Sequence, residues 1–520
     1  MVTISPGPTS PTGVAALIAE RVRLHPDRWC LVTDEERLSY EQVWERSGEL
    51  ADRLRGAGLG PGHKIAILSP NSPDCVVAMV AILRLGAVWL PVNYRDSVSI
   101  MRDTLGRLGG HALLVAPTFT SKLGELIDGL PSIGAAWVLG SGQRVHTGTI
   151  TAPEPGDRDL AAVFTTGGTT GAPKGVAFTR ERLSALIRAY AQISARDADV
   201  YLAAAPLTHV GGRICLGVLA SGGTTVVLPG FDAQAVFEAI ERHQVTTFTV
   251  TPTMLYRLLD HPGARSRDIS SLRALVYGGG PTAPSRIRQA LEVFGPVLES
   301  GFGQTEAPMF MTRMSPEEHV DEQGRPAPED RLRSVGRPTQ VCDLVIVDEA
   351  GTQLPSGQIG EIAVRGDFTM AGYYRDPDAT QARRAGQHWR TGDLGFLDPA
   401  GYLTIQGRVT DMIVTGGFNV YPAEVENAVL EIPGVRECAV FGMPDDEWGE
   451  RVVLVVALHP GVDLTAEAMR TALRPRLGGV KTPKDIRIVD DLARNANGKI
   501  LKRDMALALS STRQSRRPAP

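Results

Sequence analysis

Residues 160–175 read Leu-Ala-Ala-Val-Phe-Thr-Thr-Gly-Gly-Thr-Thr-Gly-Ala-Pro-Lys-Gly. The apolar run at its start, residues 160–164, has the length and composition of a buried strand, and the hydroxyl and glycine residues after it predict a loop. Glycine lets backbone N–H groups turn toward an anion, threonine supplies hydroxyl donors, and Lys174 supplies a positive charge. The stretch therefore predicts a polyphosphate-binding loop, although it lacks the Gly-Lys-Ser/Thr order of a Walker A loop.

The longer string over residues 166–175 resembles the signature loop of the adenylate-forming superfamily. This superfamily includes acyl-CoA synthetases, nonribosomal peptide adenylation domains and beetle luciferases. Its loop usually carries a serine where this chain has Gly167, so one hydroxyl expected near the phosphates of ATP is absent. A glycine and threonine run taken alone is as well explained by a flexible hairpin. The full string, however, favours the family loop.

Composition and charge narrow the classes of protein that this chain can represent. The 520 residues, 43% of them hydrophobic, are enough for two to four compact units. A net charge of −4 gives no electrostatic case for nucleic-acid binding. The five cysteines are scattered singly, which fits free thiols in a reducing compartment and predicts no metal cage.

The chain shows no secretory signal and no segment that we expect to span a membrane. Its longest apolar stretch, residues 76–92, is interrupted by Arg84, Gly86 and Pro91. We therefore expect a cytoplasmic protein. The sequence leaves open whether the protein acts as a monomer or as a homodimer.

The order of the expected helices and strands predicts an α/β fold. Helices and strands alternate over residues 14–139 and again over residues 180–300, as in doubly wound α/β layers. In the second range we expect helices at 180–193 and 284–294 and a strand at 296–300. Residues 335–407 change to short strands with Gly/Pro turns, which predicts a small β-barrel. The predicted divisions are an N-terminal adenylate-forming domain over residues 1–409, a mobile α+β C-terminal domain over residues 410–520, and a disordered tail near residues 508–520.

A second motif, Gly-Phe-Gly-Gln-Thr-Glu, occupies residues 301–306 after an expected strand. It resembles the family pattern Tyr-Gly-x-Thr-Glu, in which the ring stacks on adenine, the threonine contacts the α-phosphate and the glutamate holds Mg²⁺. The resemblance assigns these roles to Phe302, Thr305 and Glu306, and a carboxylate is a suitable ligand for such a cation. Phenylalanine in place of tyrosine keeps the stacking face and loses a hydroxyl.

Three further strings match family motifs in the large domain. The resemblance places His209 between the acyl site and the thiol channel, although a histidine in such a loop is most often structural. Three glycines at 278–280 let a ring or bulky acyl group lie against bare backbone, as an alternative to an ordinary turn. The resemblance assigns Asp393, in an expected Thr-Gly-Asp turn, to both ribose hydroxyls.

The C-terminal region carries the remaining motifs. The resemblance places a hinge at Thr410, assigns the strip that begins at Gly416 to the CoA thiol, and makes Lys499 the mobile lysine that bridges carboxylate and phosphate. Trp448 is expected either to pack on the nucleotide end of CoA or to belong to an interfacial core. Two residues depart from the family pattern, because Thr410 stands where Asp or Lys is usual and Ala493 replaces a proline.

These assignments give four overlapping sets of predicted residues. The predicted nucleotide-binding residues are Thr165, Thr166, Gly167, Gly168, Thr169, Thr170, Lys174, Gly278, Gly279, Gly280, Phe302, Gly303, Thr305, Asp393 and Arg408. The predicted acyl pocket contains His209, Gly279, Gly280 and Gly303, and the predicted CoA surface contains Gly416, Gly417, Phe418 and Trp448. The predicted catalytic residues are Lys499, His209, Thr305 and Glu306, with Glu306 as the metal ligand.

The resemblance implies an acyl-CoA ligase that uses ATP, Mg²⁺ and coenzyme A and forms an acyl-AMP intermediate, releasing AMP and pyrophosphate. No acidic residue stands out to pair with an α-ammonium group, which favours a hydrophobic carboxylic acid over an amino acid. The departures at Gly167, Thr410 and Ala493 suggest an alternative, a ligase that mainly transfers a preformed acyl-AMP to CoA. Loading of a carrier protein and a non-catalytic nucleotide- or acyl-binding regulator are two further alternatives.

Overall fold

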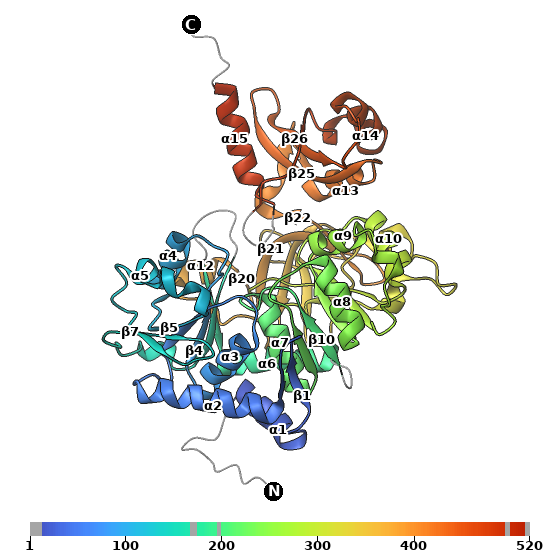
Figure 1. Ribbon diagram of the computed structural model, residues 1–520. Coiled ribbons are helices and arrows are strands. Elements are labelled where there is room, and N and C mark those ends of the chain that lie inside the picture. The colour runs from blue at the N-terminus through green and yellow to red at the C-terminus, as the bar shows by residue number, and fades with distance from the viewer. Residues whose placement is uncertain (1–12, 167–173, 195–198, 495–499, 515–520) are drawn as a thin grey trace.

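The computed structural model describes residues 13–166, 174–194, 199–494 and 500–514. One sheet of the large domain has the strand order β19-β9-β8-β4-β3-β5-β6-β7 (Figure 1). Its parallel centre consists of β3 (Lys64–Leu68), β4 (Val88–Pro91), β5 (Ala112–Val115), β6 (Ala135–Val138) and β8 (Leu160–Thr165). Its antiparallel members are β7 (Arg144–Thr147), β9 (Gly175–Thr179) and β19 (Gly372–Tyr373).

A second sheet has the order β16-β15-β14-β13-β12-β10-β11-β1-β2. Its parallel strands are β1 (Trp29–Val32), β10 (Val200–Ala203), β11 (Thr224–Val227), β12 (Thr247–Val250), β13 (Ala274–Gly278) and β14 (Leu298–Phe302). Antiparallel strands β2 (Arg37–Ser39), β15 (Thr312–Met314) and β16 (Arg337–Pro338) complete it. These two layers confirm the predicted α/β fold.

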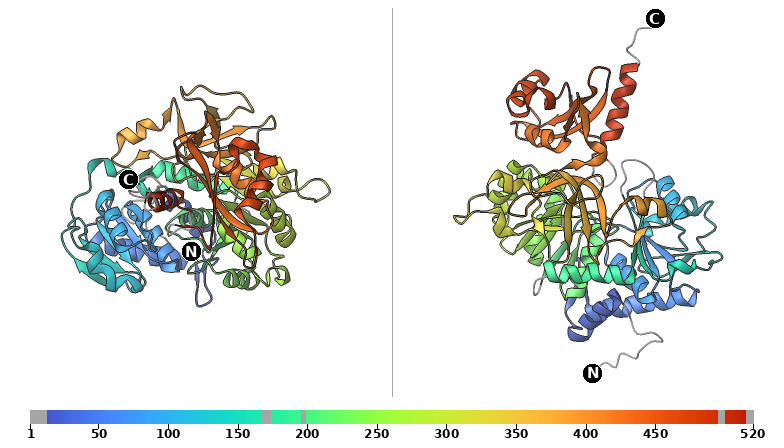
Figure 2. Two further views of the ribbon diagram at one scale, coloured as in Figure 1. Left: turned by 90° about the horizontal axis from the view of Figure 1, so that it is seen from above. Right: turned by 180° about the vertical axis from the view of Figure 1, so that it is seen from behind.

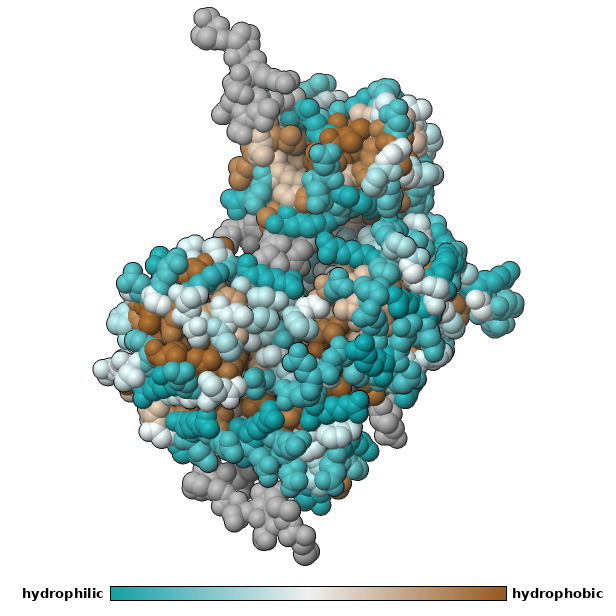
Figure 3. Space-filling view, in the orientation of Figure 1, coloured by the Kyte–Doolittle hydropathy of each residue, from teal (hydrophilic) through white to brown (hydrophobic). Residues whose placement is uncertain are grey.

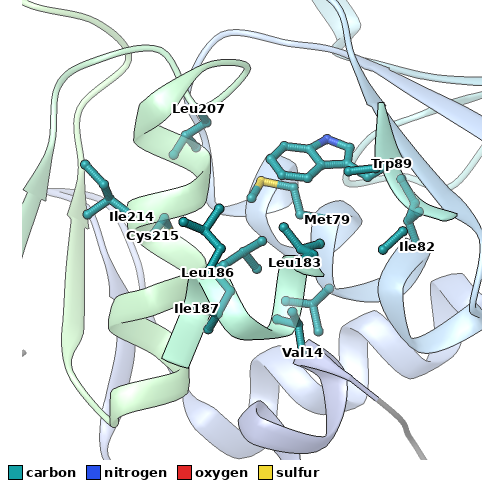
Figure 4. Packing of buried hydrophobic residues seen from close by; sticks show 14 of the residues in the cluster. Val14, Met79, Ile82, Trp89, Leu183, Leu186, Ile187, Leu207, Ile214 and Cys215 are labelled. Carbon is teal, nitrogen blue, oxygen red and sulfur yellow. The ribbon is translucent and has the colours of Figure 1, made fainter. Parts of the chain in front are cut away.

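Helices cover the two sheets and pack between them. They are α1 (Val14–Leu24), α2 (Tyr40–Gly56), α3 (Pro73–Leu85), α4 (Val98–Leu108), α5 (Leu123–Ile127), α6 (Arg180–Ile193), α7 (Val210–Ser221), α8 (Ala233–His243), α9 (Pro252–Leu259), α10 (Pro284–Phe294) and α11 (Glu329–Arg333). Helices α6 and α7 pack against each other beside α3 and Trp89, in the largest apolar core (Figure 4). No helix among the described residues is both long enough and apolar enough to cross a bilayer.

Between the layers and the C-terminal lobe lies a curled antiparallel sheet, the half-barrel (Figure 2). It contains β17 (Asp343–Val347), β18 (Gly360–Arg365), β20 (Arg384–Ala385), β21 (His388–Leu397) and β22 (Leu403–Arg408), with the short helix α12 (Pro377–Ala382). The order β17-β18-β21-β20, with β22 beside β21, is that of an open sheet and not of a closed barrel. Strand β19 leaves this region and pairs with β9, so the half-barrel segment also contributes to the first layer.

The C-terminal domain forms a separate lobe above the large domain (Figures 1 and 3). Its elements are β23 (Ile413–Thr415), β24 (Phe418–Val420), α13 (Pro422–Leu430), β25 (Val435–Asp445), β26 (Gly449–Leu458), α14 (Ala466–Lys481), β27 (Asp485–Val489) and α15 (Lys502–Gln514). The one-turn helix η5 (Val409–Asp411) connects it to the half-barrel. The hinge at Thr410 and the division at residue 410 stay predictions.

One prediction about this lobe is wrong. Residues 508–514, which we expected to be disordered, belong to helix α15. The helix is stabilised by Met505 and Leu509, which are one turn apart and pack against a small apolar cluster that includes Phe441 and Val453. Residues 515–520 lie outside the described residues.

Candidate active site

Several predicted site residues follow the carboxyl ends of parallel strands in the second sheet. The segment that carries His209 comes after β10, the glycines at 278–280 end and follow β13, and Phe302 ends β14. Carboxyl ends of parallel strands meet at one edge of a sheet, which is where ligands bind in open α/β folds. The strand that we expected to end at Ser300 continues to Phe302. The motif at residues 301–306 therefore begins inside β14 and not after it.

Close backbone contacts explain two of the glycines at this edge. A Cβ atom on Gly278 would lie 2.7 Å from the carbonyl oxygen of Gly301, and one on Gly303 would lie 2.1 Å from the backbone nitrogen of Met309. Gly279 has a φ of 82°, a conformation that side chains other than glycine rarely adopt. Packing against the backbone of the protein itself accounts for Gly278 and Gly303, and a positive φ accounts for Gly279, so an acyl group against these glycines stays a prediction.

Lys174 and Glu306 meet at one tyrosine that the sequence did not single out. The hydroxyl of Tyr373 donates a hydrogen bond of 2.7 Å to Oε1 of Glu306, and Thr305 directly precedes that glutamate. Nζ of Lys174 lies 4.8 Å from the centroid of the Tyr373 ring. The structure thus brings the lysine of the predicted phosphate loop and the predicted magnesium ligand together, although 132 positions separate them in the sequence.

The base of the phosphate loop is closed by hydrogen bonds. The backbone N–H of Thr166 donates to the carbonyl of Lys174 at 3.0 Å, and the Lys174 N–H donates to Oγ1 of Thr166 at 3.2 Å. Thr165 pairs with Gly175 across β8 and β9, so the loop is the turn of a hairpin. Gly167, Gly168, Thr169 and Thr170 lie outside the described residues, and their roles stay predictions.

His209 stands immediately before α7 and is half-buried. Nδ1 lies 3.1 Å from Oγ1 of Thr208. Burial, together with the positive charges of Arg213 and Arg95, lowers the pKa of His209 to about 4. The imidazole is therefore neutral at physiological pH, when it can act as a hydrogen-bond partner or proton acceptor.

Arg213 is a buried charge that the sequence analysis missed. It is only 8% exposed, and its guanidinium carbon lies 4.7 Å from the centroid of the Phe164 ring. Phe164 is the last residue before the predicted phosphate loop. Burial lowers the pKa of Arg213 to about 10, while the carboxylate of Glu306 acts in the opposite direction. One sequence signal could have identified it, because it is the only charged residue in the otherwise apolar segment Val210–Ser221.

Asp393 and Arg408, both predicted to contact the nucleotide, are cross-strand neighbours in the half-barrel. They are paired in register across β21 and β22, and Nε of Arg408 lies 3.4 Å from Oδ1 of Asp393. The expected Thr-Gly-Asp turn is wrong, since all three residues lie inside β21. Gly392 distorts the strand there with a φ of 77°.

The predicted CoA residues gather on one surface of the C-terminal lobe. Gly416 and Gly417 form the turn between β23 and β24 with φ of 58° and 78°, the geometry of a tight hairpin. A Cβ atom on Gly416 would lie 2.7 Å from the ring of Trp448, whose other contacts include Nζ of Lys484 at 3.8 Å from the ring centroid. Phe418, the next residue, is 61% exposed.

Lys499 lies outside the described residues, but the segments that flank it are placed. Arg494 pairs with Ile500 in an isolated antiparallel contact, and the N–H of Leu501 donates to the carbonyl of Ala493 at 2.8 Å. Nη1 of Arg494 lies 3.5 Å from Oγ1 of Thr253 on α9. The base of the lysine loop is therefore held together by backbone contacts and lies against the large domain.

Glu306 is the one residue that the sequence assigned to Mg²⁺. In the part of the chain that the structure describes, no group of three or more His, Cys, Asp or Glu side chains gathers as a metal site. A single carboxylate fits a cation whose remaining ligands are phosphate oxygens and water, which is the usual environment of Mg²⁺ beside a nucleotide.

Comparisons with known proteins identify the family of the chain. Residues 18–374 match the family model described as AMP-binding enzyme, and residues 424–499 match the AMP-binding enzyme C-terminal domain. A feruloyl-CoA synthase from Amycolatopsis sp is 33% identical over 500 residues, which cover 94% of this chain and 98% of that protein.

Two solved structures share the fold over almost the whole chain. The amide bond synthetase McbA from Marinactinospora thermotolerans has a TM-score of 0.86 and 30% identity, with 96% of this chain and 99% of McbA covered. ATP-bound MatB from Rhodopseudomonas palustris has a TM-score of 0.85 and 27% identity, with 96% and 100% covered. This chain therefore belongs to the AMP-binding enzyme family of the adenylate-forming superfamily, and within it to the AMP-forming acid–CoA ligases.

Proposed function

We propose that the protein activates a carboxylic acid with ATP and transfers the acyl group to coenzyme A. One observation carries the proposal: Lys174 and Glu306 both contact Tyr373. Lys174 lies over its ring, and Glu306 accepts a hydrogen bond from its hydroxyl. A cation and a carboxylate at the base of a glycine-rich loop suit the phosphates of a nucleotide and the metal that accompanies them. Membership of the family and the similarity to an ATP-bound structure support the same reaction.

In the first step the carboxylate of the acid attacks the α-phosphorus of ATP, and acyl-AMP and pyrophosphate form. Positive charge near the phosphate oxygens stabilises this transition state, and Lys174 supplies part of it. Glu306 would hold Mg²⁺, which neutralises phosphate charge when bound, and the Tyr373 hydroxyl orients the Glu306 carboxylate. Lys499 would bridge the carboxylate and the phosphate, and Asp393 would take the ribose hydroxyls.

In the second step the thiolate of CoA attacks the acyl carbonyl and AMP leaves. Rotation of the C-terminal lobe about Thr410 would present the turn at Gly416 and Gly417 to the acyl-AMP. The exposed ring of Phe418 and the Trp448 ring beside Lys484 offer an aromatic and positively charged surface to CoA. The substrate class that we favour is a hydrophobic or ring-bearing acid, since bare backbone at 278–280 leaves room for such a group.

The direct test offers ATP, Mg²⁺, CoA and a panel of aromatic, fatty and amino acids to the protein, and measures AMP and the thioester by mass spectrometry. We expect equimolar AMP and thioester from at least one hydrophobic acid. Glu306→Gln should lower this rate at least about a hundredfold, because it removes the charge that holds the metal. Nucleotide binding without AMP release from any acid would contradict the proposal and favour a non-catalytic regulator.

Isotope exchange between pyrophosphate and ATP tests the first step, the formation of acyl-AMP. Exchange that depends on the acid supports full adenylation, whereas no exchange beside rapid conversion of synthetic acyl-AMP and CoA would favour the ligase that uses a preformed acyl-AMP. A phosphopantetheinyl carrier protein and an amine should be compared with CoA as acceptors. The amine belongs in this comparison because McbA, a structural relative, is an amide bond synthetase.

A further inference from the structure

Buried N–H groups outnumber their acceptors around Phe164. Nε and Nη1 of Arg213 are fully buried and have no hydrogen-bond partner within the described ranges, and the same is true of Nε1 of Trp89. Both side chains contact the Phe164 ring, at 4.7 Å for the Arg213 guanidinium and 5.2 Å between the ring centroids for Trp89. Buried donors without acceptors are costly, and a bound ligand that accepts hydrogen bonds from them would remove that cost.

The surroundings of Arg213 make its charge unusual. Arg213 lies on α7, whose residues from Gly211 to Ala220 are all buried, and α7 packs against α6 in the largest apolar core (Figure 4). A Cβ atom on Gly212 would lie 2.8 Å from the Trp89 ring, so the helix packs tightly there. A buried charge is costly where a buried leucine or methionine would not be, so the Arg213 guanidinium needs an anion to offset that cost.

Arg213 lies near both the predicted acyl pocket and the predicted phosphate site. It follows His209 by four residues, and side chains on a helix lean toward its N-terminus, so Arg213 extends toward His209. The positive charge of Arg213 lowers the pKa of His209, and the carboxylate of Glu306 raises the pKa of Arg213, so Arg213 lies within electrostatic range of both. The acid must come to lie at this junction of the predicted acyl pocket and the predicted phosphate site.

We propose that Arg213 is the receptor for a carboxylate of the acid substrate. This assignment rests on the proposed function for the identity of the site, and it adds a residue that the family motifs do not contain. A planar guanidinium presents donors that match the two oxygens of a carboxylate, and desolvation strengthens the bond. The carboxylate that it binds is either the reacting one or a second one on the same acid.

The first test compares the stability of the ligand-free full chain with and without the charge. Arg213→Met should raise the melting temperature, because it removes a buried charge that has no anion to pair with. Arg84→Met is the matched control, since burial also lowers the pKa of Arg84 to about 10, but Arg84 donates to Oγ of Ser47 at 2.9 Å and stacks on Trp44. Arg84→Met should lower the melting temperature. A fall for Arg213→Met as large as that of the control would assign Arg213 to the scaffold and overturn the proposal.

The second test measures binding without turnover. Each carboxylic acid of the panel is paired with its neutral primary amide, and the thermal shift of both is measured in the presence of AMP. At least one acid should stabilise the wild-type protein more than its amide does, and Arg213→Met should abolish this preference. Arg213→Lys should keep part of it, because the charge remains and the planar fork is lost.

The outcomes separate the possible ligands of Arg213. A preference shown by monocarboxylic acids assigns the guanidinium to the reacting carboxylate, and a preference confined to dicarboxylic acids assigns it to a second one. Loss of the AMP-induced shift in Arg213→Met would assign it to phosphate and overturn the proposal, as would the lack of any acid-over-amide preference in the wild type. If the acid-over-amide preference depends on Arg213 but no acid yields AMP or thioester, the proposed reaction is contradicted. The assignment of Arg213 as a carboxylate receptor is then still supported.

Discussion

Two regions of the large domain bury a cation, and they differ in what surrounds it. Lys64 on β3, 1% exposed, forms an ion pair with Asp157, whose Oδ2 also accepts a hydrogen bond of 2.9 Å from the hydroxyl of Tyr374. Arg213 on α7 is almost as deeply buried, but its closest identified contact is the face of Phe164 and no carboxylate of the described ranges lies within ion-pair distance. We call these two regions the Lys64 cluster and the Arg213 cluster.

The neighbouring residues Tyr373 and Tyr374 connect the two regions. Successive side chains of an extended segment point in opposite directions. Tyr374 accordingly donates to Asp157 in the Lys64 cluster, whereas Tyr373 donates to Glu306 beside the Arg213 cluster. The protein itself neutralises the buried charge of Lys64, whereas we assign the buried charge of Arg213 to a ligand.

Breaking the Lys64 cluster should have the largest effect on stability. Asp157→Ala leaves the Lys64 ammonium buried without its anion, and we expect a loss of about 3–5 kcal/mol in the free energy of unfolding, measured by urea denaturation followed by circular dichroism. Asp103→Ala is the control, since the pair of Asp103 with Arg107 is exposed and should contribute less than about 1 kcal/mol. Equal stabilities of the two variants would show that the cluster does not stabilise the fold.

Acid should weaken the same cluster through His111. Burial, together with the charge of Lys64, lowers the pKa of His111 to about 4, whereas an unfolded histidine titrates near 6.5. Between these values the unfolded chain binds a proton that the folded protein does not, so this contribution is fully present above pH 6.5 and is lost as pH falls toward 4. Between pH 7 and pH 5 the loss should be about 2 kcal/mol.

The variant His111→Asn isolates this contribution. The backbone N–H of Lys64 donates to Nδ1 of His111 at 3.1 Å, and the asparagine side chain can replace that acceptor. Urea denaturation at pH 7 and pH 5 should show a smaller decrease in stability for the variant than for the wild type. An equal decrease in both proteins would exclude His111 as the source of acid sensitivity.

Local patterns predicted the elements of the fold well. The expected helices at 180–193 and 284–294 are confirmed with the same bounds, because Thr179 caps the first and Pro284 opens the second. The same reasoning missed α15, since its apolar face is narrow and its stability depends on packing against β25.

Sequence patterns did not predict which strands far apart in the chain pair with each other. Strand β1 joins the second sheet beside β11, about 195 positions away, and β19 joins the first sheet beside β9. The site shows the same limit, because family motifs identified Lys174 and Glu306 but not the tyrosine between them. Tyr373 has no distinctive local pattern, and its role arises only from the pairing of β19.

Variants of Tyr373 and Tyr374 test whether the Lys64 cluster and the Arg213 cluster differ in role. Tyr374→Phe removes the hydroxyl that donates to Asp157, and it should lower the free energy of unfolding by about 1.5 kcal/mol while the rate of thioester formation is unchanged. Urea denaturation and the thioester assay on the same preparation check both expectations. A loss of activity at unchanged stability would move Tyr374 from the scaffold to the site.

Tyr373→Phe should give the opposite result, with the smaller energetic effect. The ring stays beside Lys174, but Glu306 loses a charge-assisted hydrogen bond of 2.7 Å that fixes its carboxylate. Acid-dependent pyrophosphate exchange should slow about tenfold, which corresponds to about 1.4 kcal/mol of transition-state stabilisation. Conversion of synthetic acyl-AMP and CoA should keep its wild-type rate, because that step does not need the metal ligand. If both half-reactions slowed equally, Tyr373 would act by shaping the pocket that they share, and the division between the Lys64 cluster and the Arg213 cluster would not extend to catalysis.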